Sequence, residues 1–247
     1  MNIKFLSLCL FFGFVSQSFS QDFEGFIRYG ASYEVTNTSS DPQRIIKKNR
    51  LEKNDSVLIA YAKNGDFLKY IQNIKNAIYS YNKGMDLVYT FYKGDKTVTV
   101  TNALYGMDRA ARFESKAVEL DSIVNVNGVD CKRVQFEYRD HTSTVYYSVD
   151  EKYKGLGKVF YYMSFINQEI RFSSIRDFLV VRFEKELKDA KVIVDLLDFK
   201  KTTIDSSVFY IPDYKKSSKY DYDDGPYNVY KIKDKKYKFL ELPLKLN

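Results

Sequence analysis

The sequence predicts a mainly β protein of the α+β class, built on an antiparallel sheet with a few short helices. Three observations support this prediction. A strand of regular alternation begins after residue 20, short runs rich in aromatic and β-branched residues follow it, and Gly-containing turns separate those runs. The aromatic content of 17%, with 22 Tyr and no Trp, suits sheet faces on which a ring packs while its hydroxyl reaches water.

The first predicted strand covers residues 23–35 and alternates with a period of two. Its larger apolar residues share one parity, and we expect them in the core: Phe23, Ile27, Tyr29 and Tyr33. Its charged residues have the opposite parity, and we expect them in solvent: Glu24, Arg28 and Glu34. One dry and one wet face are typical of a strand in an antiparallel sheet.

Short turns separate the later strands. Asn64-Gly65 and Asn127-Gly128 each lie between two strand-like runs, and Asn-Gly is a strong hairpin signal because both central residues of a type I′ turn need positive φ. Lys83-Gly84, Gly94-Asp95 and Asp140-His141 separate further runs in the same way. Because these connections are short, we expect consecutive strands to be neighbours in the sheet.

Helix signals are local and few. We expect a turn of helix over residues 44–48 and a short helix over residues 104–118. Residues 178–183 and 192–199 are predicted strands.

The predicted domain organisation has three parts. Residues 1–20 are a signal peptide, residues 21–212 are one β-rich domain, and residues 213–247 are a C-terminal extension rich in Tyr, Lys and Asp. The change of composition after Pro212 predicts a loosely ordered segment instead of a second domain.

Residues 1–20 have the pattern of a secretory signal peptide. Lys4 gives a basic start, residues 5–15 form an apolar run, and Ser18 and Ser20 are small residues at the positions that precede a cut. A membrane helix needs about 20 continuous apolar residues, which this run does not reach. We therefore expect cleavage before Gln21 and a periplasmic or secreted protein. We expect no lipid anchor, because Leu8 precedes Cys9 where a lipoprotein signal has a small residue.

Charge and cysteine content exclude several classes of protein. The chain has 39 Lys and Arg against 32 Asp and Glu, a net charge of +7, but the basic residues are scattered. We therefore expect no nucleic-acid partner. Cys131 is the one cysteine beyond the signal, so we expect a buried structural thiol and a fold without an internal disulfide. We also expect a monomer.

The chemistry-bearing residues do not form a familiar catalytic pattern. His141 is the only histidine, and no Gly-x-Ser-x-Gly elbow is present, so zinc and Ser-His-Asp chemistry lack their partners. Residues 221–225 resemble a calcium loop in composition, but position twelve is Ile232 instead of an acid. We expect no enzyme activity, no metal and no cofactor. Paired carboxylates stay an alternative, because sequence does not show which acids face each other.

Three segments carry a resemblance to a known family. Residues 23–29 form the opening strand, residues 126–133 contain an N-G-x-x-C hairpin, and residues 202–215 contain an I-D-x-x-x-F-x-I-P strand. Together they resemble the bacterial lipoprotein carriers of the LolA and LolB type and their small exported relatives of unassigned function. The resemblance implies a strongly curved antiparallel sheet, or half-barrel, around an apolar hollow that accepts acyl chains in the carriers. The extension after Pro212 departs from the carriers and could plug the opening or add a strand.

The expected function is binding by a non-enzymatic exported protein, with an apolar ligand or an envelope lipid in the half-barrel and a lipid or lipidated protein as partner. Alternation along the two strands after Val129 selects the side chains that would line or fill the hollow: Val134, Phe136, Tyr138, Val145, Tyr147 and Val149. One alternative is a secreted interaction module that docks an envelope protein or glycan through a sheet edge or an aromatic face. A third is a carboxylate-based exported hydrolase.

Overall fold

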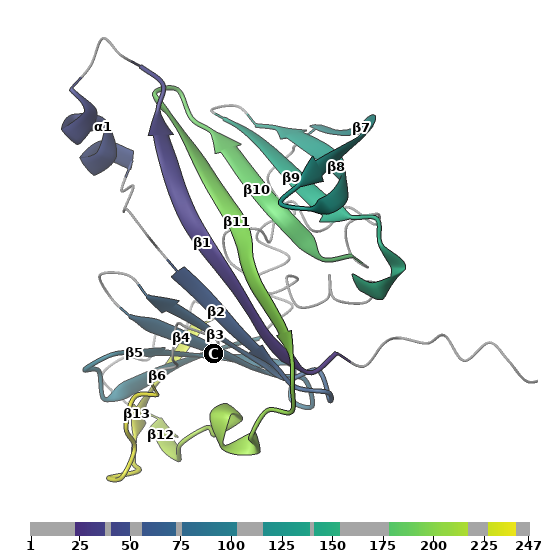
Figure 1. Cartoon of the computed structure of the whole chain (residues 1–247). Coiled ribbons are helices and arrows are strands. Elements are labelled where there is room, and N and C mark those ends of the chain that lie inside the picture. Colours follow the sequence, from purple (N-terminus) through teal and green to yellow (C-terminus); the bar gives the residue numbers. More distant parts are fainter. Residues whose placement is uncertain are drawn as a thin grey trace, which may run out of the picture.

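The computed structural model of the protein describes residues 23–37, 41–49, 56–72, 76–102, 116–138, 141–153, 178–216 and 227–240 (Figure 1). The predicted signal peptide and its cleavage site lie outside the described residues, as do most of the helix predicted over residues 104–118 and the acidic turn at residues 221–225.

The protein is mainly β, as the sequence predicts. In the described part of the chain, thirteen strands form one antiparallel sheet that is not closed, in the order β12-β13-β6-β5-β4-β3-β2-β1-β11-β10-β9-β8-β7. The strands are β1 Gly25–Val35, β2 Ser56–Tyr61, β3 Phe67–Gln72, β4 Ala77–Asn82, β5 Leu87–Tyr92, β6 Thr97–Asn102, β7 Lys116–Val126, β8 Val129–Glu137, β9 Thr142–Ser148, β10 Val180–Glu186, β11 Ala190–Lys201, β12 Tyr214–Lys216 and β13 Tyr227–Ile232. The described helices are α1 Pro42–Asn49 and the 3₁₀ helices Glu151–Tyr153 and Ser206–Phe209.

The hairpin turns follow the local sequence. Asn127 and Gly128 have φ values of 53° and 84°, the pair of positive values that a type I′ turn needs between β7 and β8. The turn between β2 and β3 is longer: the Gly65 N–H donates to the Ala62 carbonyl and the Ala62 N–H to the Asp66 carbonyl, both at 2.9 Å, while Gly65 has a φ of 91°. This is a three-residue loop with a glycine bulge.

Consecutive strands are neighbours from β1 to β6 and from β7 to β11, as predicted for strands joined by short turns. Strands β1 and β2, and strands β9 and β10, are also neighbours although residues 36–55 and 149–179 separate them. Two pairings join distant parts of the chain. β1 pairs with β11, which places Ile27 opposite Phe199, and β6 pairs with β13, which places Thr99 opposite Val229. Two segments of the extension after Pro212, β12 and β13, belong to the sheet. This agrees with the alternative that the extension adds a strand, whereas its residues 217–226 and 241–247 lie outside the described residues.

Two local predictions differ from the structure, and one is confirmed. Residues 116–118 belong to β7 and not to a helix, because each pairs with β8 in the sheet. The closing strand expected over residues 202–215 is interrupted by the 3₁₀ helix Ser206–Phe209, whose first turn is capped by the Asp205 carboxylate accepting the Ser207 N–H at 2.8 Å. Helix α1 forms where a turn of helix was predicted.

The two faces of the sheet are covered differently along its length. We call the face that carries Ile27 the inner face and the face that carries Arg28 the outer face. On the inner face, β1, β2 and β8–β11 supply one apolar cluster that includes Tyr29, Val134 and Phe183. The Tyr29 hydroxyl reaches over β11 and donates to the Val180 carbonyl at 2.8 Å. Figure 1 shows the β7–β11 half of the sheet at an angle to the β2–β6 half, so that the sheet is strongly curved.

The alternation predicted for the first strand is confirmed. Phe23, Ile27 and Tyr29 are buried, and Tyr33 packs half-buried against Ile45 and Ala190. On the other parity, Glu34 is exposed as predicted, whereas Glu24 and Arg28 are half-buried on the outer face. The Glu24 carboxylate accepts the Ile204 N–H at 2.9 Å, and the Arg28 guanidinium lies 3.9 Å from the Asp198 carboxylate.

The outer face changes character between the two halves. On β9–β11 it carries ion pairs, including the Arg182 guanidinium on the Asp195 carboxylate at 2.6 Å. On β2–β6 it is apolar and is covered by the segment after β11. The second apolar cluster lies there, with contributions from Leu58, Phe91 and Val98 of the sheet and from Ile204 and Tyr237 of the covering segment.

Candidate functional site

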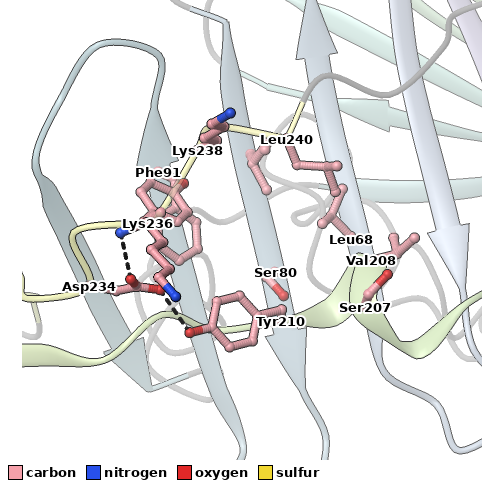
Figure 2. A pocket seen from close by; sticks show the side chains of 12 residues that line it. Leu68, Ser80, Phe91, Ser207, Val208, Tyr210, Asp234, Lys236, Lys238 and Leu240 are labelled. Atoms are coloured by element: carbon pink, nitrogen blue, oxygen red, sulfur yellow. Dashed lines mark hydrogen bonds between the residues drawn. The ribbon is translucent and has the colours of Figure 1, made fainter.

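A pocket of about 320 Å³ lies on the outer face of the β2–β6 half (Figure 2). One wall is the sheet and the other is the chain that crosses it, first at the 3₁₀ helix Ser206–Phe209 and again at residues 234–240. We call residues 234–240 the strap. The pocket is lined by Leu68, Ile78, Ser80, Phe91, Ser207, Val208, Tyr210, Asp234, Lys236, Tyr237, Lys238 and Leu240.

The floor of the pocket follows from strand alternation. Leu68 of β3 is the register partner of Ser80 in β4, and Ile78 of β4 is the partner of Phe91 in β5, so all four side chains share the outer face. All four are buried. The floor is thus apolar except for the Ser80 hydroxyl.

The strap is held on the sheet by aromatic contacts. The Tyr237 ring lies 5.7 Å from the Phe91 ring, and the Phe239 ring lies 6.3 Å from the Tyr70 ring, measured between centroids. Burial raises the pKa of the Tyr237 hydroxyl to about 12, which keeps it neutral. The apolar residues of the strap therefore form a roof over an apolar floor.

The mouth of the pocket is polar and charged. The Tyr210 hydroxyl donates to one oxygen of the Asp234 carboxylate at 3.0 Å, and the Lys236 N–H donates to the other at 2.7 Å. The hydrogen bond to Asp234 raises the pKa of Tyr210. Figure 2 shows the Lys236 side chain extending over the mouth toward Tyr210. The Tyr210–Asp234 hydrogen bond ties the strap to the end of the 3₁₀ helix Ser206–Phe209.

The six side chains predicted to line a hollow lie on the other face of the sheet. Val134 and Val145 are register partners on β8 and β9, and both are fully buried in the inner apolar cluster with Phe136 and Tyr147. Tyr138 packs half-buried against the same cluster and stacks on His141, with ring centroids 4.4 Å apart. The sixth, Val149, is half-buried just after β9 and is not part of that cluster. The structure thus brings five of the six predicted residues together, and a ligand beside them stays a prediction.

Lys69 is a buried charged residue that sequence reasoning did not single out. It is fully buried on the inner face of β3, between Ile59 of β2 and Tyr79 of β4, and its ammonium lies 4.5 Å from the centre of the Tyr79 ring. Burial lowers the pKa of Lys69 from 10.5 to about 7. The available signal was a lysine at a core parity of β3, flanked by Phe67 and Ile71.

The pocket itself was also missed, although the sequence contained a signal for it. Residues 57–60 and 67–70 are buried at every position, so β2 and β3 are dry on both faces. Continuous burial of this kind requires a cover on each side of the sheet. The apolar residues 237, 239 and 240, beyond the last strand, were candidates for the outer cover.

The remaining sequence candidates show no constellation for catalysis in the described residues. Cys131 is buried on the outer face, and burial raises the pKa of its thiol to about 11. Within the described ranges, no three His, Cys, Asp or Glu side chains are grouped so that they could hold a metal ion. Across those same ranges, no helix has the length and apolar character needed to cross a membrane.

Comparison with known proteins adds little. No protein-family model and no curated protein matches this chain. Among solved structures that do match is one described as "Structure of PNGF-II in C2 space group", with a TM-score of 0.42 and 15% sequence identity. The match covers 74% of this chain and 29% of that one, so this chain spans less than a third of that protein's length. A similarity of this size carries no argument, and the resemblance to lipoprotein carriers stays a prediction.

Proposed function

We propose that the protein is a non-enzymatic exported binding protein that holds an apolar ligand in the pocket between the β3–β5 strands and the strap. One observation carries the proposal: a pocket of about 320 Å³ whose floor is apolar except for the Ser80 hydroxyl, whose roof includes Tyr237 and Leu240, and whose mouth is polar and charged. Ligand pockets in proteins combine these properties, because apolar walls supply affinity and a few polar groups fix orientation. Export follows from the predicted signal peptide.

The arrangement of the walls supports reversible binding. The floor is part of the sheet and is buried on rigid strands, whereas the roof is a single crossing of the chain whose polar tie, the Tyr210–Asp234 bond, is exposed. An exposed hydrogen bond contributes only about 0.5–1.5 kcal/mol. Opening this bond would widen the mouth for a ligand, while the aromatic contacts of Tyr237 and Phe239 keep the strap on the sheet.

A neutral probe tests the proposal without depending on any charged group. Titration with 1-octanol, followed by calorimetry, should show one saturable site. Ser80→Leu places a larger apolar side chain on the floor of the pocket and should weaken binding at least tenfold. Thr90→Leu is the matched control, because Thr90 lies on the inner face of the neighbouring strand β5, as the register partner of Tyr79. It should bind octanol as the unchanged protein does.

The measurements distinguish a loss of the fold, a ligand site elsewhere in the protein and the absence of ligand binding. Thermal melting of both variants shows whether the fold is retained, and a second pocket variant, Val208→Trp, fills the space from the side of the 3₁₀ helix Ser206–Phe209. Saturable binding that neither pocket variant weakens would place the ligand elsewhere, for example beside Val134 and Val145. The absence of any saturable site would overturn the binding function and favour the secreted interaction module in its place.

A further inference from the structure

We infer that the ligand of this pocket is a single-chain amphiphile with an anionic headgroup and a tail of about eight to ten carbons. The inference rests on the proposed function and adds the chemical class of the ligand. Two features of the site carry it: the charge at the mouth and the volume behind it.

The charge at the mouth favours an anion. Three charged residues line the pocket, namely Lys236, Lys238 and Asp234. The Asp234 carboxylate already accepts hydrogen bonds from Tyr210 and from the Lys236 N–H, so both of its oxygens are engaged within the protein. The Lys236 ammonium extends over the mouth beside Tyr210 (Figure 2). A carboxylate or a phosphate at this position would meet an ammonium donor at the end of an apolar cavity.

A cationic headgroup fits the same position poorly. It would approach the Lys236 ammonium directly, and the one carboxylate at the mouth already accepts the Tyr210 hydroxyl that ties the strap. The overall charge of the chain, +7, acts in the same direction by attracting anions from solution. Both effects favour an anion over a cation of the same size.

The volume limits the tail. A cavity of about 320 Å³ holds roughly ten groups of the size of a water molecule or a methylene, each taking about 30 Å³. A chain of eight to ten carbons fills it. The acyl chains of a diacyl lipid or of a lipoprotein exceed this space several times. The pocket therefore suits a medium-chain carboxylate or a monoalkyl phosphate.

A headgroup series at constant chain length tests the charge. Octanoate, octyl phosphate, 1-octanol and octylammonium are titrated into the unchanged protein at low and at physiological salt. We expect octanoate and octyl phosphate to bind about tenfold more tightly than octylammonium, with 1-octanol between them, and the difference should shrink as salt screens the charges. Lys236→Glu should abolish the preference for the anions. Lys235→Glu is the matched control, since it reverses a charge in the same turn but outside the lining of the pocket, and it should change the preference no more than about twofold.

A length series at constant headgroup tests the volume. From butanoate to octanoate, affinity should rise roughly fourfold for each added methylene, as expected for apolar burial. The rise should stop between eight and ten carbons. A steady rise through tetradecanoate would overturn the limit on the tail.

The two proposals fail in different ways. Equal binding of all four octyl compounds, or a preference that survives in Lys236→Glu, would overturn the anionic headgroup and leave the binding function intact. A failure of every compound, 1-octanol included, would overturn the binding function itself. The difference between octanoate and octyl phosphate then shows which anion the mouth prefers.

Discussion

The two halves of the sheet differ in which of their faces is buried under other parts of the chain. In the β7–β11 half, the inner face is dry and the outer face carries ion pairs such as Arg182–Asp195. In the β2–β6 half, the outer face is dry under the strap, and the inner face becomes polar toward the edge, where Thr90 pairs with Thr99. Strands β2 and β3, the part of the β2–β6 half nearest to β1, are buried on both faces. The difference shows that the cover, not the strand itself, decides which face of a strand is core.

The largest expected effect comes from a charge placed where both halves meet. Ile27→Asp on β1 should unfold the protein, because an unpaired carboxylate buried on the inner face costs several kcal/mol and a domain has only about 5–15 kcal/mol of stability. Ser32→Asp, on the exposed outer face of the same strand, should change stability by less than about 0.5 kcal/mol.

On β2 the same test should give a different pattern. Leu58→Asp and Ile59→Asp lie on opposite faces, and both should unfold the protein, because both side chains are fully buried. Thermal melting followed by circular dichroism measures all four variants. A tolerated Leu58→Asp would contradict the dry outer face under the strap.

The second effect is a gain of stability and concerns Lys69 at the centre of the β2–β6 half. Between pH 7 and pH 10.5 the unfolded chain binds a proton on Lys69 that the folded chain lacks, so the free energy of unfolding rises with pH over this range. Below about pH 7 the folded state bears the full cost of the buried charge. Lys69→Met should therefore stabilise the protein by a few kcal/mol at pH 6, at about 1.4 kcal/mol for each pKa unit, and by much less at pH 10.

Urea unfolding at a series of pH values measures this change. Lys96→Met is the matched control, because Lys96 is an exposed lysine in the same half of the sheet. It should shift the free energy of unfolding by less than about 0.5 kcal/mol at each pH. A Lys69→Met protein that is less stable than the unchanged protein at pH 6 would show that the ammonium is held by favourable contacts that outweigh its burial.

A third, smaller effect tests the inner face of the β7–β11 half. Tyr29→Phe removes the hydroxyl that donates to the Val180 carbonyl and leaves that buried acceptor without its partner. The expected loss is about 1–3 kcal/mol. Tyr33→Phe, farther along β1 and half-buried, should cost less than about 0.5 kcal/mol. Equal costs for the two variants would mean that the Tyr29–Val180 bond adds no measurable stability.

The smallest effect concerns the strap. Tyr210→Phe removes the exposed bond to Asp234 and should lower global stability by about 0.5–1 kcal/mol at most. Its main consequence should be local: amide hydrogen exchange at Tyr237, whose N–H donates to the Asp234 carbonyl at 3.2 Å, should become faster. Exchange in β8 and β9 should not change. A uniform acceleration across both halves would contradict a strap that opens on its own.

Local features of the fold could be predicted from the sequence, because they depend on residues that are near one another in the chain. The period of two over β1 identified Ile27 and Tyr29 as core, since adjacent side chains on a strand must point to opposite faces. Asn127-Gly128 identified its hairpin because few residues other than Gly and Asn adopt positive φ at low cost. Burial of Cys131 was predicted because it is the one cysteine beyond the predicted signal peptide and lies at the start of a predicted strand.

The candidate site could not be predicted in this way, because it depends on pairings between distant segments. β13 must join β6, more than a hundred residues earlier in the chain, before the strap can lie over Phe91 and Ile78. No local alternation of side chains encodes the pairing of β13 with β6. The alternation along β8 and β9 instead predicted a ligand site on the inner face. The predicted Val134 and Val145 do lie together, but as a packed pair in the core.

The sequence by itself determined the class of fold, the hairpins and the facing of the first strand, all of which follow from side-chain period and backbone φ within a few residues. Only the tertiary structure decided the order of the strands, the two-sided burial of β2 and β3, the burial of Lys69 and the position of the pocket. The physical reason is that burial is a property of a surface and its cover. A strand carries the surface in its own residues, whereas the cover comes from another part of the chain.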